Sequence, residues 1–171
     1  MSVADNVLSA NAALSCLGTI PDCDLVLRQL NLVNGKDDGY GMNIDFHLAQ
    51  KDEPVAFNVN VMDDDAFAKK VATNPRLTKN TGGYWNGDDM TMYLPRGRNF
   101  TVTEHEFLHA LGRGHDVFNY RDIQNRPGVM SYATDFIRST RPTKRDYKIL
   151  VDNYRDYPAR TSSMWNLFRS K

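Results

Sequence analysis

Residues 105–116 read His-Glu-Phe-Leu-His-Ala-Leu-Gly-Arg-Gly-His-Asp and contain three of the chain's four histidines. On an α-helix, residues four apart lie about one turn apart on one face, so His105 and His109 can reach the same metal ion. Glu106 then projects beside that ion, where it can act as a general base on a water molecule. This spacing predicts a metal-dependent hydrolase.

A third ligand requires the helix to end. His115 lies six residues beyond His109 and could not return to the same ion from a helix that continued straight. Gly112 offers the left-handed conformation that ends a helix, and Gly114 loosens the next turn. His115 can therefore complete a three-histidine site.

The start of this helix is marked by Thr101 and Glu104, which fit the capping-box pattern. We predict a helix from near Thr101 to near Gly112. Its apolar side can pack into a core while the histidines face a cleft, and it consists of Phe107, Leu108, Ala110 and Leu111. The alternative is a buried amphipathic helix with incidental histidines, which would require all the specified residues of the extended motif to coincide by chance.

Residues 128–132, Gly-Val-Met-Ser-Tyr, follow the histidine motif. A long histidine motif followed by a methionine-containing turn resembles the metzincin clan of zinc endopeptidases. Met130 matches the methionine of that turn, and Tyr132 stands where astacin-like and serralysin-like members carry a displaceable tyrosine ligand. Asp116 instead matches adamalysin-like members. The resemblance is therefore to the clan and not to one branch.

This resemblance, which directly covers residues 90–132, implies an α+β, metzincin-like fold. Such a fold has a twisted mixed β-sheet with helices in an upper subdomain, a mostly helical or irregular lower subdomain, and a zinc cleft between the two. Residues 1–171 would form one catalytic domain, with an upper subdomain of about residues 1–112 and a lower subdomain of about residues 113–171.

The resemblance also implies an activity, the hydrolysis of peptide bonds in extended polypeptides. One catalytic Zn²⁺ would bind His105, His109 and His115, and Glu106 would take a proton from the attacking water. Tyr132 would be a displaceable ligand and then a phenolic donor to the reacting carbonyl oxygen.

Residues 90–94 alternate apolar and polar side chains and are followed by Pro95. In the metzincin plan this position resembles the edge strand that borders the cleft. An extended substrate could pair with it as an added strand. The residues of this substrate-binding strand would be Met90, Thr91, Met92, Tyr93 and Leu94. Trp85, in the glycine-rich segment before it, would either line the rim or pack inside.

Hydrophobic spacing predicts further helices and strands. The predicted helices span residues 2–17, 63–71 and 143–154, and the predicted strands span residues 24–30, 42–48 and 55–61. Gly18 and Pro21 would end the first helix, and the turn pairs Asn34-Gly35 and Asp38-Gly39 would separate the first two strands. His47 stands alone on its strand and is predicted to be structural.

Composition bounds the remaining possibilities. With 171 residues, 41% of them hydrophobic and 25% charged, the chain fits one compact globular domain, which we expect to be monomeric. A formal net charge of zero gives no electrostatic argument for nucleic acid, and no apolar run is long enough to span a bilayer. The acids at 63–65 could invite Ca²⁺, but no calcium-loop motif surrounds them and acids are common at helix starts.

The two cysteines, Cys16 and Cys23, could close a small disulfide loop or stay reduced. A third interpretation, in which one of them caps the zinc of a latent form as in matrixins, has little support because the surrounding sequence is unlike that pattern. The N-terminal residues contain neither a basic leader nor a sustained hydrophobic region, so they predict no secretory signal peptide. The family resemblance nevertheless favours action outside the cell.

Two other functions stay open. A zinc-containing, non-catalytic binding module or effector would use the histidines for folding and bind a partner through the edge strand. Glu106 weighs against it, and no cysteine adjoins the motif to supply the fourth ligand of a structural zinc site. The other alternative is a hydrolase of a non-protein amide.

Overall fold

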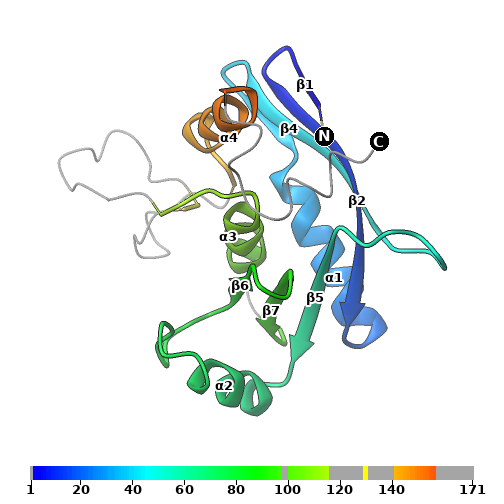
Figure 1. The fold of residues 1–171 in the computed structure, drawn as a ribbon, viewed down its shortest axis with the longest axis vertical. Coiled ribbons are helices and arrows are strands. Elements are labelled where there is room, and N and C mark those ends of the chain that lie inside the picture. The colour runs from blue at the N-terminus through cyan, green and yellow to red at the C-terminus, as the bar shows by residue number, and fades with distance from the viewer. Residues whose placement is uncertain (1, 98–99, 116–128, 131–140, 157–171) are drawn as a thin grey trace.

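The computed structural model describes residues 2–97, 100–115, 129–130 and 141–156, which form an α+β fold with a mixed seven-stranded sheet and four α-helices (Figure 1). The strands are β1 (Ser2–Ala4), β2 (Val7–Leu17), β3 (Gly35–Asp37), β4 (Tyr40–Leu48), β5 (Phe57–Met62), β6 (Tyr84–Asn86) and β7 (Thr91–Pro95). The helices are α1 (Ile20–Leu30), α2 (Asp64–Ala72), α3 (Phe100–Ala110) and α4 (Lys144–Asp156), with a 3₁₀ turn, η1 (Asn31–Val33), after α1.

The centre of the sheet is parallel and its margins are antiparallel. Along the sheet the order is β3-β4-β2-β5-β7-β6, and β1 pairs with the first residues of β2. Strand β2 runs parallel to β4 and β5, and β5 runs parallel to β7. Hairpin-type antiparallel pairs join β1 to β2, β3 to β4 and β6 to β7.

One face of the sheet carries the main core. Helix α3 lies over this face between α1 and α4 (Figure 1), and α1 packs directly against α3. Phe107 of α3 is fully buried, with its ring centroid 5.0 Å from that of Phe46 on β4 and 5.7 Å from that of Phe57 on β5. The helix that carries the histidine motif is therefore fixed to the middle of the sheet by aromatic contacts.

Strand β7 is buried on both faces. Met92 and Leu94 join the main core, while Tyr93, which points the other way, belongs to a second cluster with residues of α2 and β6. In that cluster the rings of Tyr84 and Tyr93 stack with centroids 4.9 Å apart. Alternate side chains of one strand thus face different helices.

Several predicted elements are confirmed. The structure has strands at β4 and β5 and a strand at β7, and α4 covers the predicted C-terminal helix. Helix α2 begins where the acids predict, since the Asp63 carboxylate accepts the Ala66 N–H at 2.8 Å. The coarse α+β class is also confirmed.

The predicted helix at residues 2–17 is wrong, because this segment forms the β1–β2 hairpin. Asp5 and Asn6 both have positive φ, 49° and 60°, as a two-residue hairpin turn requires. Leu8, Ala12 and Leu14 occupy alternate positions and are fully buried in the main core. The helix propensity of alanine and leucine is overridden because β2 lies at the centre of the sheet.

The predicted strand at residues 24–30 is also wrong, because these residues belong to α1. Thr19 caps this helix: its hydroxyl accepts the Asp22 N–H at 3.3 Å, and the Asp22 carboxylate accepts the Thr19 N–H at 3.0 Å. Pro21 sits in the first turn, where its missing N–H leaves no bond unmade. Pro21 therefore begins a helix instead of ending one.

The prediction that residues 90–94 form the edge strand is wrong as well. Strand β7 lies between β5 and β6, with Tyr84 opposite Tyr93 and Asn86 opposite Thr91. All five residues of β7 are buried. In the described part of the sheet, the outermost strand on this side is β6, so β6 and not β7 offers its outer edge.

Helix α4 adds to the same core. Tyr147, Leu150 and Val151 are buried in the cluster that contains Phe107, and the Tyr147 hydroxyl donates to the Val33 carbonyl at 3.0 Å. Most other residues of the predicted lower subdomain lie outside the described residues.

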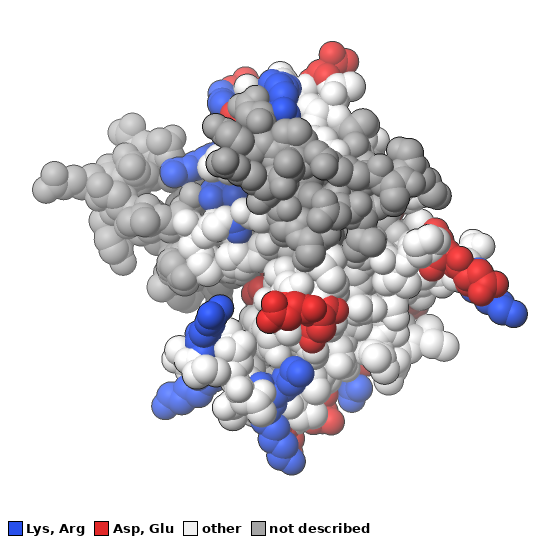
Figure 2. Space-filling model, viewed as in Figure 1, with Lys and Arg blue, Asp and Glu red and all other residues white. Residues whose placement is uncertain are grey.

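The charge distribution on the surface and the hydropathy of the helices agree with what the composition predicts. Basic and acidic side chains both occur on the described part of the face in Figure 2, as expected for zero formal net charge. Among the described helices, none combines the length and apolar character needed to cross a membrane.

Cys16 and Cys23 form a disulfide that links the end of β2 to α1, with their Cα atoms 5.9 Å apart. The interpretations with reduced thiols or with a zinc-capping cysteine do not apply to this structure. The bond closes the short connection between a central strand and the helix that packs on α3.

Removing this disulfide should destabilise the fold. We expect a Cys16→Ala/Cys23→Ala variant to lose about 2–3 kcal/mol of unfolding free energy, because the unfolded chain regains the freedom of the closed loop. Thermal unfolding followed by circular dichroism measures this loss. A reductant should lower the melting temperature of the wild type and leave that of the variant unchanged; equal melting temperatures for oxidised and fully reduced wild type would contradict the expectation.

Candidate metal centre

Three histidine side chains converge at the end of α3. The Nε2 atoms of His105 and His109 are 3.1 Å apart, and each lies 3.0 Å from Nε2 of His115. Among the described residues, these three form the group whose ligand atoms lie close enough to hold one metal ion. His105 and His109 are half-buried and His115 is exposed, so the group opens to solvent.

These distances fit a metal ion of the size of zinc. Zinc–nitrogen bonds of about 2.0–2.1 Å in tetrahedral geometry hold two nitrogen ligands about 3.3 Å apart. Three ring nitrogens that point at one another present three lone pairs to the same point, an arrangement that a cation stabilises. The structure thus brings together the predicted ligands His105, His109 and His115 as a group that is placed to hold a metal ion.

Two backbone carbonyls orient the rings. The Nδ1–H of His105 donates to the Val129 carbonyl at 2.9 Å, and the Nδ1–H of His109 donates to the Arg113 carbonyl at 2.8 Å. With the proton held on Nδ1, the unprotonated Nε2 of each ring faces the shared centre. Both rings are therefore fixed in the tautomer that binds metal.

The end of α3 positions the third histidine. Gly112 has φ of 86° and its N–H donates to the His109 carbonyl at 2.8 Å, while the Arg113 N–H donates to the Leu108 carbonyl at 2.9 Å. These two bonds define a Schellman motif, which reverses the chain at a left-handed residue. The predicted helix end at Gly112 is confirmed, and this reversal brings His115 back to the ligands on α3.

Glu106 lies next to the histidines and is 7% exposed. Its Oε2 accepts the backbone N–H of Trp85, on β6, at 2.9 Å. Burial, opposed in part by the hydrogen bond from Trp85, raises the pKa of Glu106 to about 7. A cation held by the histidines would also favour the charged carboxylate.

His109 is set up as a neutral ligand. The pKa of His109 is lowered to about 4: burial is the main cause, the bond to the Arg113 carbonyl opposes it, and the nearby His115 and Arg113 side chains add smaller lowering effects. Metal ions bind the unprotonated imidazole, so this shift keeps the ligand available near neutral pH.

The fourth histidine serves elsewhere. His47 Nε2 lies 2.8 Å from a carboxylate oxygen of Glu53. The hydrogen bond with Glu53 raises the pKa of His47, against a smaller opposing effect of burial. The prediction that His47 is structural agrees with this ion pair.

The other described residues that the sequence singled out for the site do not belong to the histidine cluster. Met130 is fully buried in the main core and directly follows Val129, which orients His105. Tyr132 and Asp116 lie outside the described residues. Trp85 is half-buried against the main core. Its backbone N–H, not its ring, reaches Glu106.

Sequence patterns did not indicate the groups that hold the ligands in place. The carbonyls of Val129 and Arg113 and the N–H of Trp85 are backbone atoms, which leave no trace in residue identity. The buried partner of Arg113 is Asp146, at 3.3 Å. Thr143 and Asp146 do fit a capping pattern, which could have marked Asp146.

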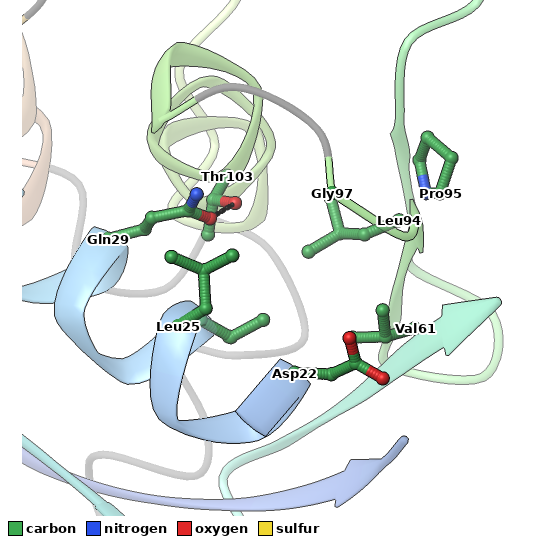
Figure 3. A pocket seen from close by; sticks show the side chains of 9 residues that line it. Asp22, Leu25, Gln29, Val61, Leu94, Pro95, Gly97 and Thr103 are labelled. Atoms are coloured by element: carbon green, nitrogen blue, oxygen red, sulfur yellow. Dashed lines mark hydrogen bonds between the residues drawn. The ribbon is translucent and has the colours of Figure 1, made fainter. Parts of the chain in front are cut away.

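A small cavity lies away from the histidines. Figure 3 shows it between α1, α3 and the strands β5 and β7, with Gln29 hydrogen-bonded to Thr103 at one side. Its volume is about 20 Å³, which is room for one water molecule and not for a substrate.

Comparisons with known proteins assign no family. No protein-family model matches this chain, and a search of curated proteins finds no significant match. The geometry of the site therefore carries the functional argument.

Metal binding can be tested with two matched histidine variants. His105→Ala should weaken zinc binding by more than about 100-fold, because losing a direct ligand should cost more than losing a residue that only orients one. His47→Ala removes a histidine that lies outside the cluster and should bind zinc like the wild type. Calorimetric titration and elemental analysis after dialysis measure both; equal zinc content in the two variants would contradict the assignment.

Proposed function

We propose that this protein is a zinc-dependent endopeptidase of the metzincin type. The observation that carries the proposal is the cluster of His105, His109 and His115 with Glu106 beside it. Three histidine ligands leave a coordination position for a reactant, as catalytic zinc sites do, whereas structural sites fill all four positions with protein ligands. Zinc bound there would polarise both a water molecule and the carbonyl under attack.

Glu106 serves as the proton carrier in this proposal. Its carboxylate lies in a buried position, held by the Trp85 N–H through Oε2. Oε1 takes the proton from the attacking water and then delivers it to the leaving amine. A buried carboxylate with a raised pKa is suited to both steps near neutral pH.

Strand β6 is the proposed substrate-binding edge. Its Trp85 N–H donates to Glu106, so β6 lies next to the residue that we propose as proton carrier. An extended peptide that pairs with backbone groups of β6 other than the Trp85 N–H would bring its own carbonyls near the histidines. This arrangement gives affinity for polypeptide with little dependence on side chains.

The finer metzincin features belong to the same proposal. Met130 would form the floor of the site. It directly follows Val129, whose carbonyl orients His105. Tyr132 would act as a displaceable ligand and phenolic donor, as the resemblance implies.

Replacing Glu106 tests the proposal. Glu106→Gln keeps the size and the hydrogen bond to Trp85 but cannot accept a proton, so peptide cleavage should fall by about 10²–10⁴-fold at unchanged zinc affinity. Mass spectrometry of a diverse peptide library, incubated with zinc-loaded protein, measures cleavage.

The matched control is His47→Ala, which should cleave like the wild type. Chelation should abolish cleavage and added zinc should restore it. Equal cleavage by Glu106→Gln and wild type would overturn the mechanism, and zinc-loaded wild type that cleaves no peptide would favour the non-catalytic binding module.

A further inference from the structure

A buried ion pair joins the metal-binding loop to α4. The Arg113 Nη2 donates to the Asp146 Oδ1 at 3.3 Å, and these side chains are 5% and 0% exposed. Charges at such depth are costly unless they are paired and hydrogen-bonded. Each of the two buried charges therefore needs the other as its partner.

Arg113 contacts the ligand His109 directly and the third ligand, His115, only through the neighbouring Gly114 peptide. Its carbonyl accepts the Nδ1–H of His109 at 2.8 Å. Its guanidinium Nη1 donates to the Gly114 carbonyl at 2.8 Å, one peptide before His115. The planar guanidinium thus spans Asp146 and the backbone that leads into the third ligand.

Asp146 is itself anchored. Its Oδ2 accepts the backbone N–H of Thr143 at 2.9 Å and the Thr143 hydroxyl at 3.1 Å, which caps α4. One residue further, Tyr147 bonds the Val33 carbonyl, and Leu150 is fully buried in the main core. Asp146 is therefore fixed to a helix that is packed on the sheet.

We propose that Arg113 and Asp146 are positioning residues for the metal centre, through which α4 sets the placement of His109 and His115. Schellman motifs commonly place an apolar residue at the position of Arg113. An apolar residue would bury equally well, but it would neither donate to the Gly114 carbonyl nor pair with Asp146 of α4. The inference depends on the metal-binding part of the proposed function and not on peptide hydrolysis.

The experiment compares zinc affinity with stability in Asp146→Asn. This nearly isosteric change removes the charge, so zinc Kd should rise by at least about tenfold, the usual cost of losing a group that orients a ligand. Competition with a chromophoric chelator measures Kd, thermal unfolding measures stability, and the absorption spectrum of the Co²⁺-loaded protein reports ligand geometry. The spectrum should change as well.

Two controls lie on the same helix. Asp152→Asn alters a half-buried acid that pairs with Lys148, and Val151→Ala destabilises the core without touching the ion pair. Both should keep the wild-type zinc Kd and cobalt spectrum.

Arg113→Lys provides a second variant that keeps the positive charge and the fold. A lysine ammonium lacks the planar fork that spans Asp146 and the Gly114 carbonyl, so zinc Kd should rise several-fold. Wild-type Kd and spectrum in either folded variant would overturn the proposal, and so would an equal loss of affinity in Val151→Ala.

Discussion

The candidate site depends on the convergence of three ring nitrogens from one short stretch of chain. A helix supplies two of them because its period places His105 and His109 on one face. It cannot supply the third, so the chain must reverse within a few residues. The left-handed Gly112 and the two backbone bonds of the Schellman motif produce that reversal.

This local arrangement needs a rigid support on each side. Phe107, which lies midway between His105 and His109 in the sequence, locks α3 to the sheet through Phe46 and Phe57. On the other side, Asp146 ties the loop to α4, which is packed into the same core. Strand β6, at the end of the described part of the sheet, then adds the Trp85 N–H that holds Glu106. Sheet, helices and loop each contribute one constraint to a single site.

The errors of sequence prediction have physical causes. Residues 2–17 are rich in helix-forming alanine, yet most of them form β2, which lies at the parallel centre of the mixed sheet between β4 and β5, where strand pairing outweighs propensity. Pro21 was equally compatible with a helix end and a helix start, and its capping partners Thr19 and Asp22 decide for the start. The alternation at 90–94 revealed a strand but not its neighbours, because strand order is a long-range property.

The sequence by itself determined the candidate metal ligands, their common helix and the point where that helix ends, since these depend on spacing over a few residues. The disulfide between Cys16 and Cys23 was one of several open alternatives. Only the tertiary structure decided which strand lies at the edge, which carbonyls orient the histidines, and that Asp146 pairs with Arg113. Such contacts join residues far apart in the chain, often through backbone atoms, and residue identity alone does not encode them.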